Sequence, residues 1–159
     1  SLDWIIGGWQ LSGTYNWASG RPFTVYSGIN TFSNVVQSFA NCNNCPRNLG
    51  NLVERNGTNY WFSEAAQAMF SQPAPGELGN TGRNYFIGPR QFQTDASLLK
   101  KFRFTETMSF DLRVDARNLT NNASFGLPTA TFNSTVFGRI RDNVTSFARR
   151  IQLSGKFNF

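Results

Sequence analysis

The chain has 159 residues, a formal net charge of +6 and an aromatic content of 15%, with 16 Phe and 14 Gly. It contains no histidine, which excludes every catalytic arrangement that needs one within this chain, and we expect neither enzymatic activity nor a cofactor. Lys and Arg are scattered without forming a basic stripe, which argues against nucleic-acid binding. No apolar run approaches the roughly 20 residues of a membrane helix. The composition favours β-strands and turns.

The first predicted strand covers residues 3–28, which begin with a strict alternation of apolar and polar side chains. Trp9, Tyr15 and Trp17 fall on its apolar face. Proline cannot donate to a sheet ladder, so residues 20–22 (GRP) interrupt the pattern before the extended path resumes. A strand of this reach exceeds what most soluble sheets use.

Residues 29–91 are predicted to form a long loop, because Asn, Ser, Gly and Pro are frequent there and the alternation stops. The only cysteines, Cys42 and Cys45, lie in this loop. A zinc site would need two further ligands, and a redox-active pair would need a thioredoxin-like context. A local disulfide, which suits an oxidising compartment, is the preferred interpretation.

Local structure is expected inside this loop, including a helix-like stretch around residues 63–70. Four loop aromatics either contact a ligand or anchor the loop: Tyr60, Trp61, Phe62 and Phe70. An ordered loop of about 60 residues needs a small core of its own, so anchoring is the preferred interpretation.

A hairpin follows, with strands at 92–104 and 108–118 joined by a tight turn at 105–107. The aromatic residues expected on its outer, apolar face are Phe102, Phe104 and Phe110. The charged residues expected on its inner face are Asp95, Lys101, Arg103, Asp111, Arg113, Asp115 and Arg117. A second long loop at 119–147 leads to a last strand at 148–159. Its last nine residues, 151–159, alternate without a break and end on Phe159.

Two architectures fit these strands: a soluble sandwich with an aromatic core, and a transmembrane β-barrel. A dry sandwich core would have to pair every one of the inner charges, whereas a wet barrel lumen tolerates them. In an up-and-down sheet both long loops lie at one end and the short turn at the other, which is the rule for outer-membrane barrels. Aromatic residues near both ends match the girdles of such barrels. We therefore predict an all-β fold of about four antiparallel, up-and-down strands of a transmembrane barrel.

Several passages match a known family in the same order along the chain. They are residues 8–13 (GWQLSG), 19–23 (SGRPF), 79–84 (GNTGRN), 88–89 (GP), 95–98 (DASL), 101–102 (KF), 117–121 (RNLTN), 125–126 (FG) and 150–159 (RIQLSGKFNF). They resemble the C-terminal end of TonB-dependent outer-membrane transporters, especially the Oar-like receptors with a carboxypeptidase-regulatory-like N-terminal domain. The resemblance covers nearly the whole chain apart from the loop cores.

The resemblance implies a barrel of about 22 strands around an N-terminal plug. It also implies a bacterial outer-membrane location and energised import of a siderophore, vitamin, sugar or peptide. Phe157 and Phe159 match the terminal signal that the barrel-assembly machinery reads in that family. The partners implied are outer-membrane lipid, the remaining barrel strands, the plug and, through the plug, TonB.

The sequence departs from the family in having no plug, no TonB box and only about four strands, while the smallest single-chain barrels need about eight. Two expectations remain open. The chain is a segment of a longer transporter, or it is a self-assembling structural protein in which further copies complete an oligomeric barrel or fibre by edge pairing. The second alternative would place it at the cell surface or in an extracellular assembly.

Overall fold

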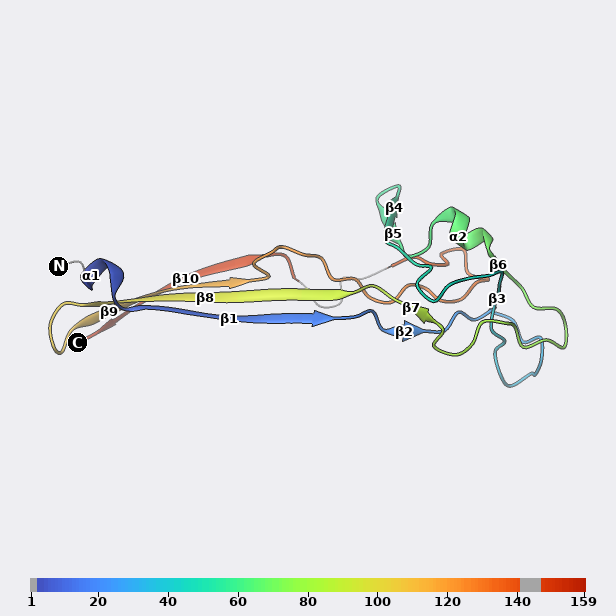
Figure 1. Cartoon of the computed structure of the whole chain (residues 1–159), viewed down its shortest axis with the longest axis horizontal. Coiled ribbons are helices and arrows are strands. Elements are labelled where there is room, and N and C mark those ends of the chain that lie inside the picture. Colours follow the sequence, from blue (N-terminus) through green and yellow to red (C-terminus); the bar gives the residue numbers. More distant parts are fainter. Residues whose placement is uncertain (1–2, 141–146) are drawn as a thin grey trace. The chain divides into compact units, whose positions relative to one another are not determined.

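The computed structural model describes residues 3–140 and 147–159 (Figure 1). The chain divides into two compact units. We call residues 1–17, 92–123 and 145–159 the sheet unit, and residues 18–91 and 124–144 the loop unit.

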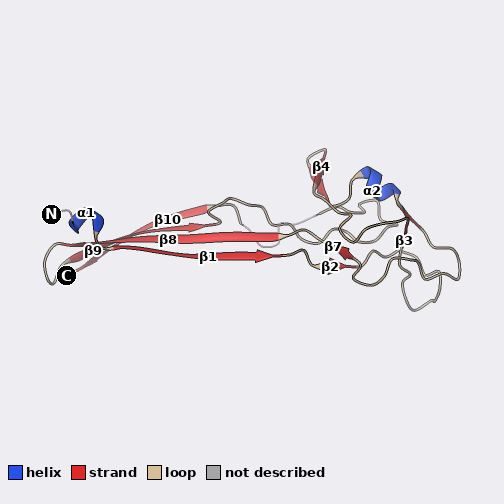
Figure 2. Ribbon diagram, viewed as in Figure 1, coloured by secondary structure: helices blue, strands red, loops and turns tan. Residues whose placement is uncertain are grey.

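The sheet unit is built on four strands in the order β1-β8-β9-β10, and neighbours in the sheet run antiparallel (Figures 1 and 2). Their bounds are β1 (Trp9–Ala18), β8 (Gln91–Arg103), β9 (Ser109–Arg117) and β10 (Arg150–Asn158). Among the described residues the sheet is open, with β1 and β10 as its two edges. The predicted all-β, up-and-down fold is therefore confirmed.

The register of the sheet gives it one apolar and one polar face. Val114 of β9 lies opposite Leu98 of β8 on one side and Leu153 of β10 on the other. The next position, Arg113, lies opposite Leu99 and Ser154. Because side chains alternate across a strand, even positions of β8 and β9 share one face with odd positions of β10.

The first predicted strand is wrong at both of its ends. Asp3–Ile6 form a helical turn, α1, and β1 begins only at Trp9 and ends at Ala18. Gly8 explains the late start: its φ is +74°, and an added Cβ would lie 2.6 Å from the carbonyl oxygen of Lys101. The chain therefore needs a glycine where it turns out of α1 onto β8.

The other predicted strands differ from the observed ones by one or two residues at each end. The predicted turn at 105–107 lies inside a slightly wider connection, in which the Phe104 amide donates to the Met108 carbonyl at 3.0 Å. Antiparallel order places this turn, α1 and the C-terminal end of β10 at one end of the sheet, which we call the short-turn end. The connections 19–90 and 118–149 both leave from the opposite end, which we call the long-loop end.

The loop unit is a folded body made of short elements. Its helix is α2 (Glu64–Ala68), which begins after the N-cap Ser63, whose hydroxyl accepts from the Ala66 amide at 3.1 Å. Its paired strands are β2 (Pro22–Phe23) with β7 (Phe86–Ile87), β3 (Asn41–Cys42) with β6 (Phe70–Ser71), and β4 (Val53–Arg55) with β5 (Thr58–Tyr60). The β4–β5 hairpin turns at Asn56 and Gly57, both with positive φ, as a two-residue hairpin requires.

Aromatic side chains form the core of the loop unit, with Phe62 completely buried at its centre. Phe62 packs against the rings of Phe70 at 5.2 Å and Phe137 at 5.5 Å between centroids. Phe137 comes from the second long loop, and backbone hydrogen bonds reinforce this meeting, including one from the Trp61 amide to the Gly138 carbonyl at 2.7 Å. The two loops that the sequence separates thus fold as one body.

Candidate functional site

The polar face of the sheet carries all seven charged residues predicted to face a lumen. Register pairs place Lys101 opposite Asp111, with Nζ and Oδ1 4.0 Å apart. Along β9, Arg113 Nε donates to Asp115 Oδ1 at 2.9 Å. Arg103 lies at the short-turn end, opposite Ser109.

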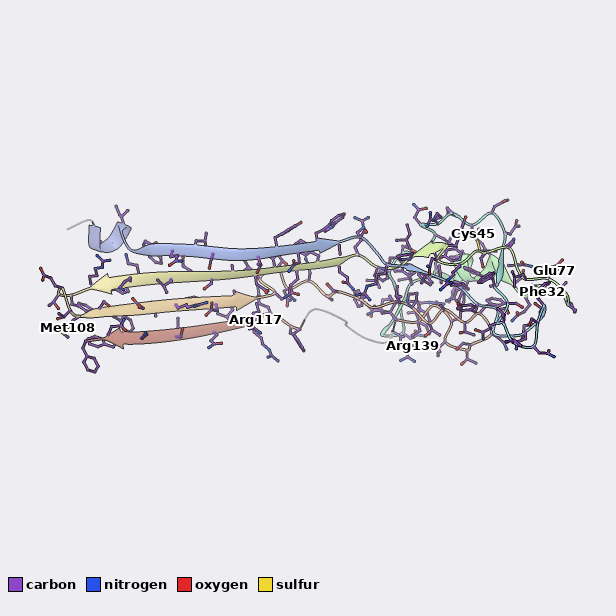
Figure 3. The ribbon with its side chains drawn as sticks, turned by 90° about the horizontal axis from the view of Figure 1, so that it is seen from below. Phe32, Cys45, Glu77, Met108, Arg117 and Arg139 are labelled. Carbon is purple, nitrogen blue, oxygen red and sulfur yellow. A yellow bond between two sulfur atoms is a disulfide. The ribbon has the colours of Figure 1, made fainter. Side chains whose placement is uncertain are left out.

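A hollow of about 390 Å³ lies on this face. The polar side chains that line it come from all four strands: Ser12 and Thr14 of β1, Asp95 and Ser97 of β8, Arg113, Asp115 and Arg117 of β9, and Gln152 of β10. Arg117 is the last residue of β9, so the hollow occupies the half of the sheet toward the long-loop end (Figure 3). The size suits a small solute.

Asp95, at the edge of this hollow, has a structural role at the end of β9. Its carboxylate accepts a hydrogen bond from the Asn118 backbone amide at 2.8 Å and another from Gln93 Nε2 at 3.2 Å. The Asn118 side chain, 4% exposed, in turn donates to the carbonyls of Asn122 and Phe147. Asp95 therefore fixes the place where β9 ends and the following connection starts.

The predicted girdle residues lie on the apolar face. The ring of Tyr15 contacts Phe92 of β8, and those of Phe102 and Phe110 stack at 6.3 Å across β8 and β9. Four of these predicted residues are more than half exposed: Trp9, Tyr15, Trp17 and Phe104. So continuous an exposed apolar surface is unusual for a soluble monomer.

The terminal aromatics lie at the short-turn end of the same face. Phe157 packs against Phe104 and Phe110, with centroids 6.3 and 6.5 Å apart. Phe159 follows the last strand residue and is 95% exposed, with its ring 6.3 Å from that of Phe157.

Sequence reasoning missed the role of Lys100, a lysine on the apolar face that is only 3% exposed. Its ammonium group donates to the carbonyls of Ile5, at 3.0 Å, and Gly7. It also lies 4.9 Å from the ring centroid of Trp9, whose indole N–H donates to the same Ile5 carbonyl at 2.9 Å. A cation at the carbonyl end of a helical turn is favourable, so Lys100 fastens α1 to the sheet. Ile5 and Gly7 precede Lys100 by more than 90 residues, so no local sequence pattern predicts these contacts.

The predicted disulfide between Cys42 and Cys45 is present in the loop unit. The Asn80 side chain binds the backbone of Cys42 with two hydrogen bonds: it accepts from the Cys42 amide at 2.8 Å and donates to the Cys42 carbonyl at 3.1 Å. The Tyr85 hydroxyl donates to the Cys45 carbonyl at 2.7 Å. The disulfide and the hydrogen bonds with Asn80 and Tyr85 therefore stabilise the same local turn.

The loop aromatics anchor the loop unit. Phe62 and Phe70 lie in its core, and Trp61 Nε1 donates to the Ile87 carbonyl at 3.0 Å. The guanidinium group of Arg55 lies 3.9 Å from the ring centroid of Tyr60. These contacts are packing contacts within the loop unit, which agrees with the prediction that the four aromatic residues anchor the loop.

Within residues 3–140 and 147–159, no group of three or more His, Cys, Asp or Glu side chains is placed to hold a metal ion. Neither helix in the described part of the chain is long and apolar enough to cross a membrane.

Comparison with known proteins adds one finding. The family described as "Outer membrane beta barrel domain" matches residues 1–152, nearly the whole chain. No curated protein and no solved structure matches. The family match agrees with the antiparallel sheet and its two-faced pattern. The chain therefore belongs to the outer membrane beta barrel domain family, and its place is the bacterial outer membrane.

Proposed function

We propose that the chain is the C-terminal segment of the barrel of a TonB-dependent transporter, which imports a siderophore, vitamin, sugar or peptide with energy delivered through TonB. The observation that carries the proposal is the two-faced open sheet, apolar on one side and polar and hollowed on the other. A barrel that passes a solute needs lipid outside and water inside. The ordered set of transporter-like passages along the chain supports the energised class.

The ends of the sheet support an orientation for this segment. Outer-membrane barrels place short turns in the periplasm and long loops outside the cell. The loop unit then belongs to the cell exterior, where its disulfide suits an oxidising environment. The 105–107 turn and Phe159 then belong to the periplasmic rim.

The partners follow from the surfaces. The apolar face takes outer-membrane lipid, and the edges β1 and β10 take the remaining barrel strands. The polar face takes a plug, through which TonB acts. The exposed terminal aromatics Phe157 and Phe159 offer the barrel-assembly machinery its signal. The role is transport, without catalysis and without a cofactor.

Uptake by cells that carry the natural, full-length protein tests the proposal. Four labelled probes cover the proposed cargo: a ferric siderophore, cobalamin, an oligosaccharide and a short peptide. We expect at least one to accumulate, and to stop accumulating when TonB is deleted or a protonophore collapses the proton gradient. Equal accumulation with and without TonB would rule out energised transport.

Self-assembly is a second candidate, favoured by the two edges β1 and β10, which remain unpaired among the described residues. Exposed edges pair readily with further copies of the same strand. The mass of the polypeptide isolated from outer membranes distinguishes the candidates. A chain of about 18 kDa in multimers of itself would favour self-assembly. A much longer chain that encodes further strands and a plug would favour transport.

A further inference from the structure

We propose that Arg117 and Arg150 form a binding site for a small multivalent anion, such as a dicarboxylate or a phosphate, on the polar face of the sheet. The inference rests on the proposed function, because it assigns a chemical class to the cargo that the barrel admits. It concerns the long-loop end of the sheet, where a solute from outside the cell would arrive first in the orientation proposed above.

The register of β9 and β10 creates the site. Arg117 and Arg150 are direct cross-strand partners, so their side chains leave the same face side by side. Like charges in this position repel each other and destabilise the pairing. An anion between the two guanidinium groups turns this repulsion into attraction.

The neighbouring carboxylates offset only part of the charge of this pair, through the attraction between Asp115 and Arg117. Asp115 is engaged by Arg113 at 2.9 Å, and Asp95 accepts from the Asn118 amide and from Gln93. Among the described residues, neither Arg117 nor Arg150 forms an ion pair with a carboxylate. Both side chains are exposed on the face. The pair therefore keeps a net positive charge that a ligand can neutralise.

The geometry around the pair suits a small ligand. Arg117 and Arg113 line the hollow of about 390 Å³. Gln152, which follows Arg150 on the same face of β10, lines it as well. The guanidinium group of Arg150 lies 5.4 Å from the ring centroid of Phe147, a cation–π contact that does not use its N–H donors. The hydroxyl group of Ser12 supplies a further donor across the hollow, whereas that of Ser97 is hydrogen-bonded to Asp115.

The chemistry of arginine selects the class of ligand. Each guanidinium presents N–H groups in a rigid fork that matches the two oxygens of a carboxylate or phosphate. Two forks from adjacent strands fit a ligand with two negative groups better than one with a single charge. A neutral sugar would leave the repulsion between the two arginines in place.

Equilibrium dialysis of the purified natural protein tests the site, with succinate and inorganic phosphate as charged probes and glycerol as the uncharged one. We expect at least one charged probe to bind, more weakly as salt rises, and glycerol not to bind. Arg117→Gln and Arg150→Gln should each weaken binding about tenfold, the effect of losing one charge-assisted hydrogen bond. Arg117→Lys should give an intermediate loss, because it keeps the charge and removes the fork.

Arg103→Gln is the matched control, since it removes the same charge from the same face at the short-turn end. It should leave probe affinity within about twofold, because the exposed charge is distant and screened. An equal loss in the control would mean that net charge alone attracts the anion, and the site would be refuted. Absence of binding by both charged probes would also refute it. Arg117→Lys keeps the test decisive if a Gln variant fails to insert.

Dialysis needs no energised membrane, so its result is separate from the uptake test. Anion binding without TonB-dependent uptake would refute the transporter and retain the site. TonB-dependent uptake of an uncharged probe alone, with no anion binding, would retain the transporter and refute the site.

Discussion

The loop unit and the sheet unit differ in where their apolar side chains lie. Among the described residues, every buried apolar side chain except Ala116 belongs to the loop unit. In the sheet unit the large apolar side chains point outward, with Leu11 at 76%, Leu153 at 68% and Ile151 at 67% exposure. The loop unit thus contains its own core, whereas the sheet leaves its apolar surface to its surroundings.

This difference shows that the two units draw stability from different sources. Packing of aromatic rings around Phe62 stabilises the loop unit in water. Among the described residues no second sheet covers the apolar face, so the sheet requires lipid on that face and further strands at its edges. A change in one unit should therefore be felt mainly in that unit.

The largest effect on either unit is expected from Phe62→Ala in the loop unit. Emptying this completely buried position should lower the stability of the loop unit by about 3–5 kcal/mol. Limited proteolysis of the natural protein on intact cells should then cut the loop unit faster, while the sheet stays inserted. Phe32→Ala, at a position that is 63% exposed in the same unit, is the control and should change little (Figure 3). Loss of membrane insertion in Phe62→Ala would show that the units are not independent.

A somewhat smaller effect is expected from Val114→Lys, which attacks the sheet instead. Both register partners of Val114 are leucines, so a lysine there has an apolar side chain directly opposite it on either strand and should cost about 2–4 kcal/mol of insertion free energy at mid-membrane. Leu112 is a poorer choice because it lies opposite Lys100.

Ser97→Lys is the control for this sheet variant, because it adds the same charge on the polar face, opposite Asp115. Folding into liposomes, followed by the heat-modifiable mobility of the barrel in gels, measures both variants. Equal losses in the two variants would contradict the assignment of the faces.

The smallest effect is expected from Lys100→Met, which keeps the length of the side chain and removes its charge. The Gly7 carbonyl loses its ammonium donor and the Ile5 carbonyl keeps only the Trp9 indole N–H, which should weaken the docking of α1 by about 1.5–3 kcal/mol. Hydrogen exchange at the start of β1 should speed up. Lys101→Met, the neighbour on the polar face, should leave that exchange unchanged, because Lys101 contacts Asp111 and not α1. Unchanged exchange in Lys100→Met would mean that the lysine does not hold α1.

Alternation alone was enough to predict β8, β9 and β10 to within two residues at each end, together with the residues on each face. It failed where a local conformation overrides the pattern: Ile5, Gly7 and Trp9 alternate like a strand, yet Asp3–Ile6 are helical. The left-handed backbone at Gly8 and the bonds from Lys100 produce this turn, and neither is visible as periodicity.

The anion site and the core of the loop unit needed the structure for a related reason. The pairing of Arg117 with Arg150 depends on a register set across the connection 118–149, and a shift by two residues would preserve every face while separating the two arginines. Likewise, the sequence indicated that the loop aromatics anchor the loop, but Phe62 meets Phe137 only through folding of two separate loops. Long-range register and loop packing leave little local signal.

The most direct test of the account is a spin-label scan along β10 of the natural protein in lipid bilayers, with single labels at positions 151, 152, 153 and 154. We predict that labels at 151 and 153 are reached by oxygen dissolved in the lipid. Labels at 152 and 154 should be reached by a water-soluble nickel chelate, giving an alternation of period two. Equal accessibility at all four positions, or the opposite alternation, would contradict a sheet with lipid on one face and water on the other.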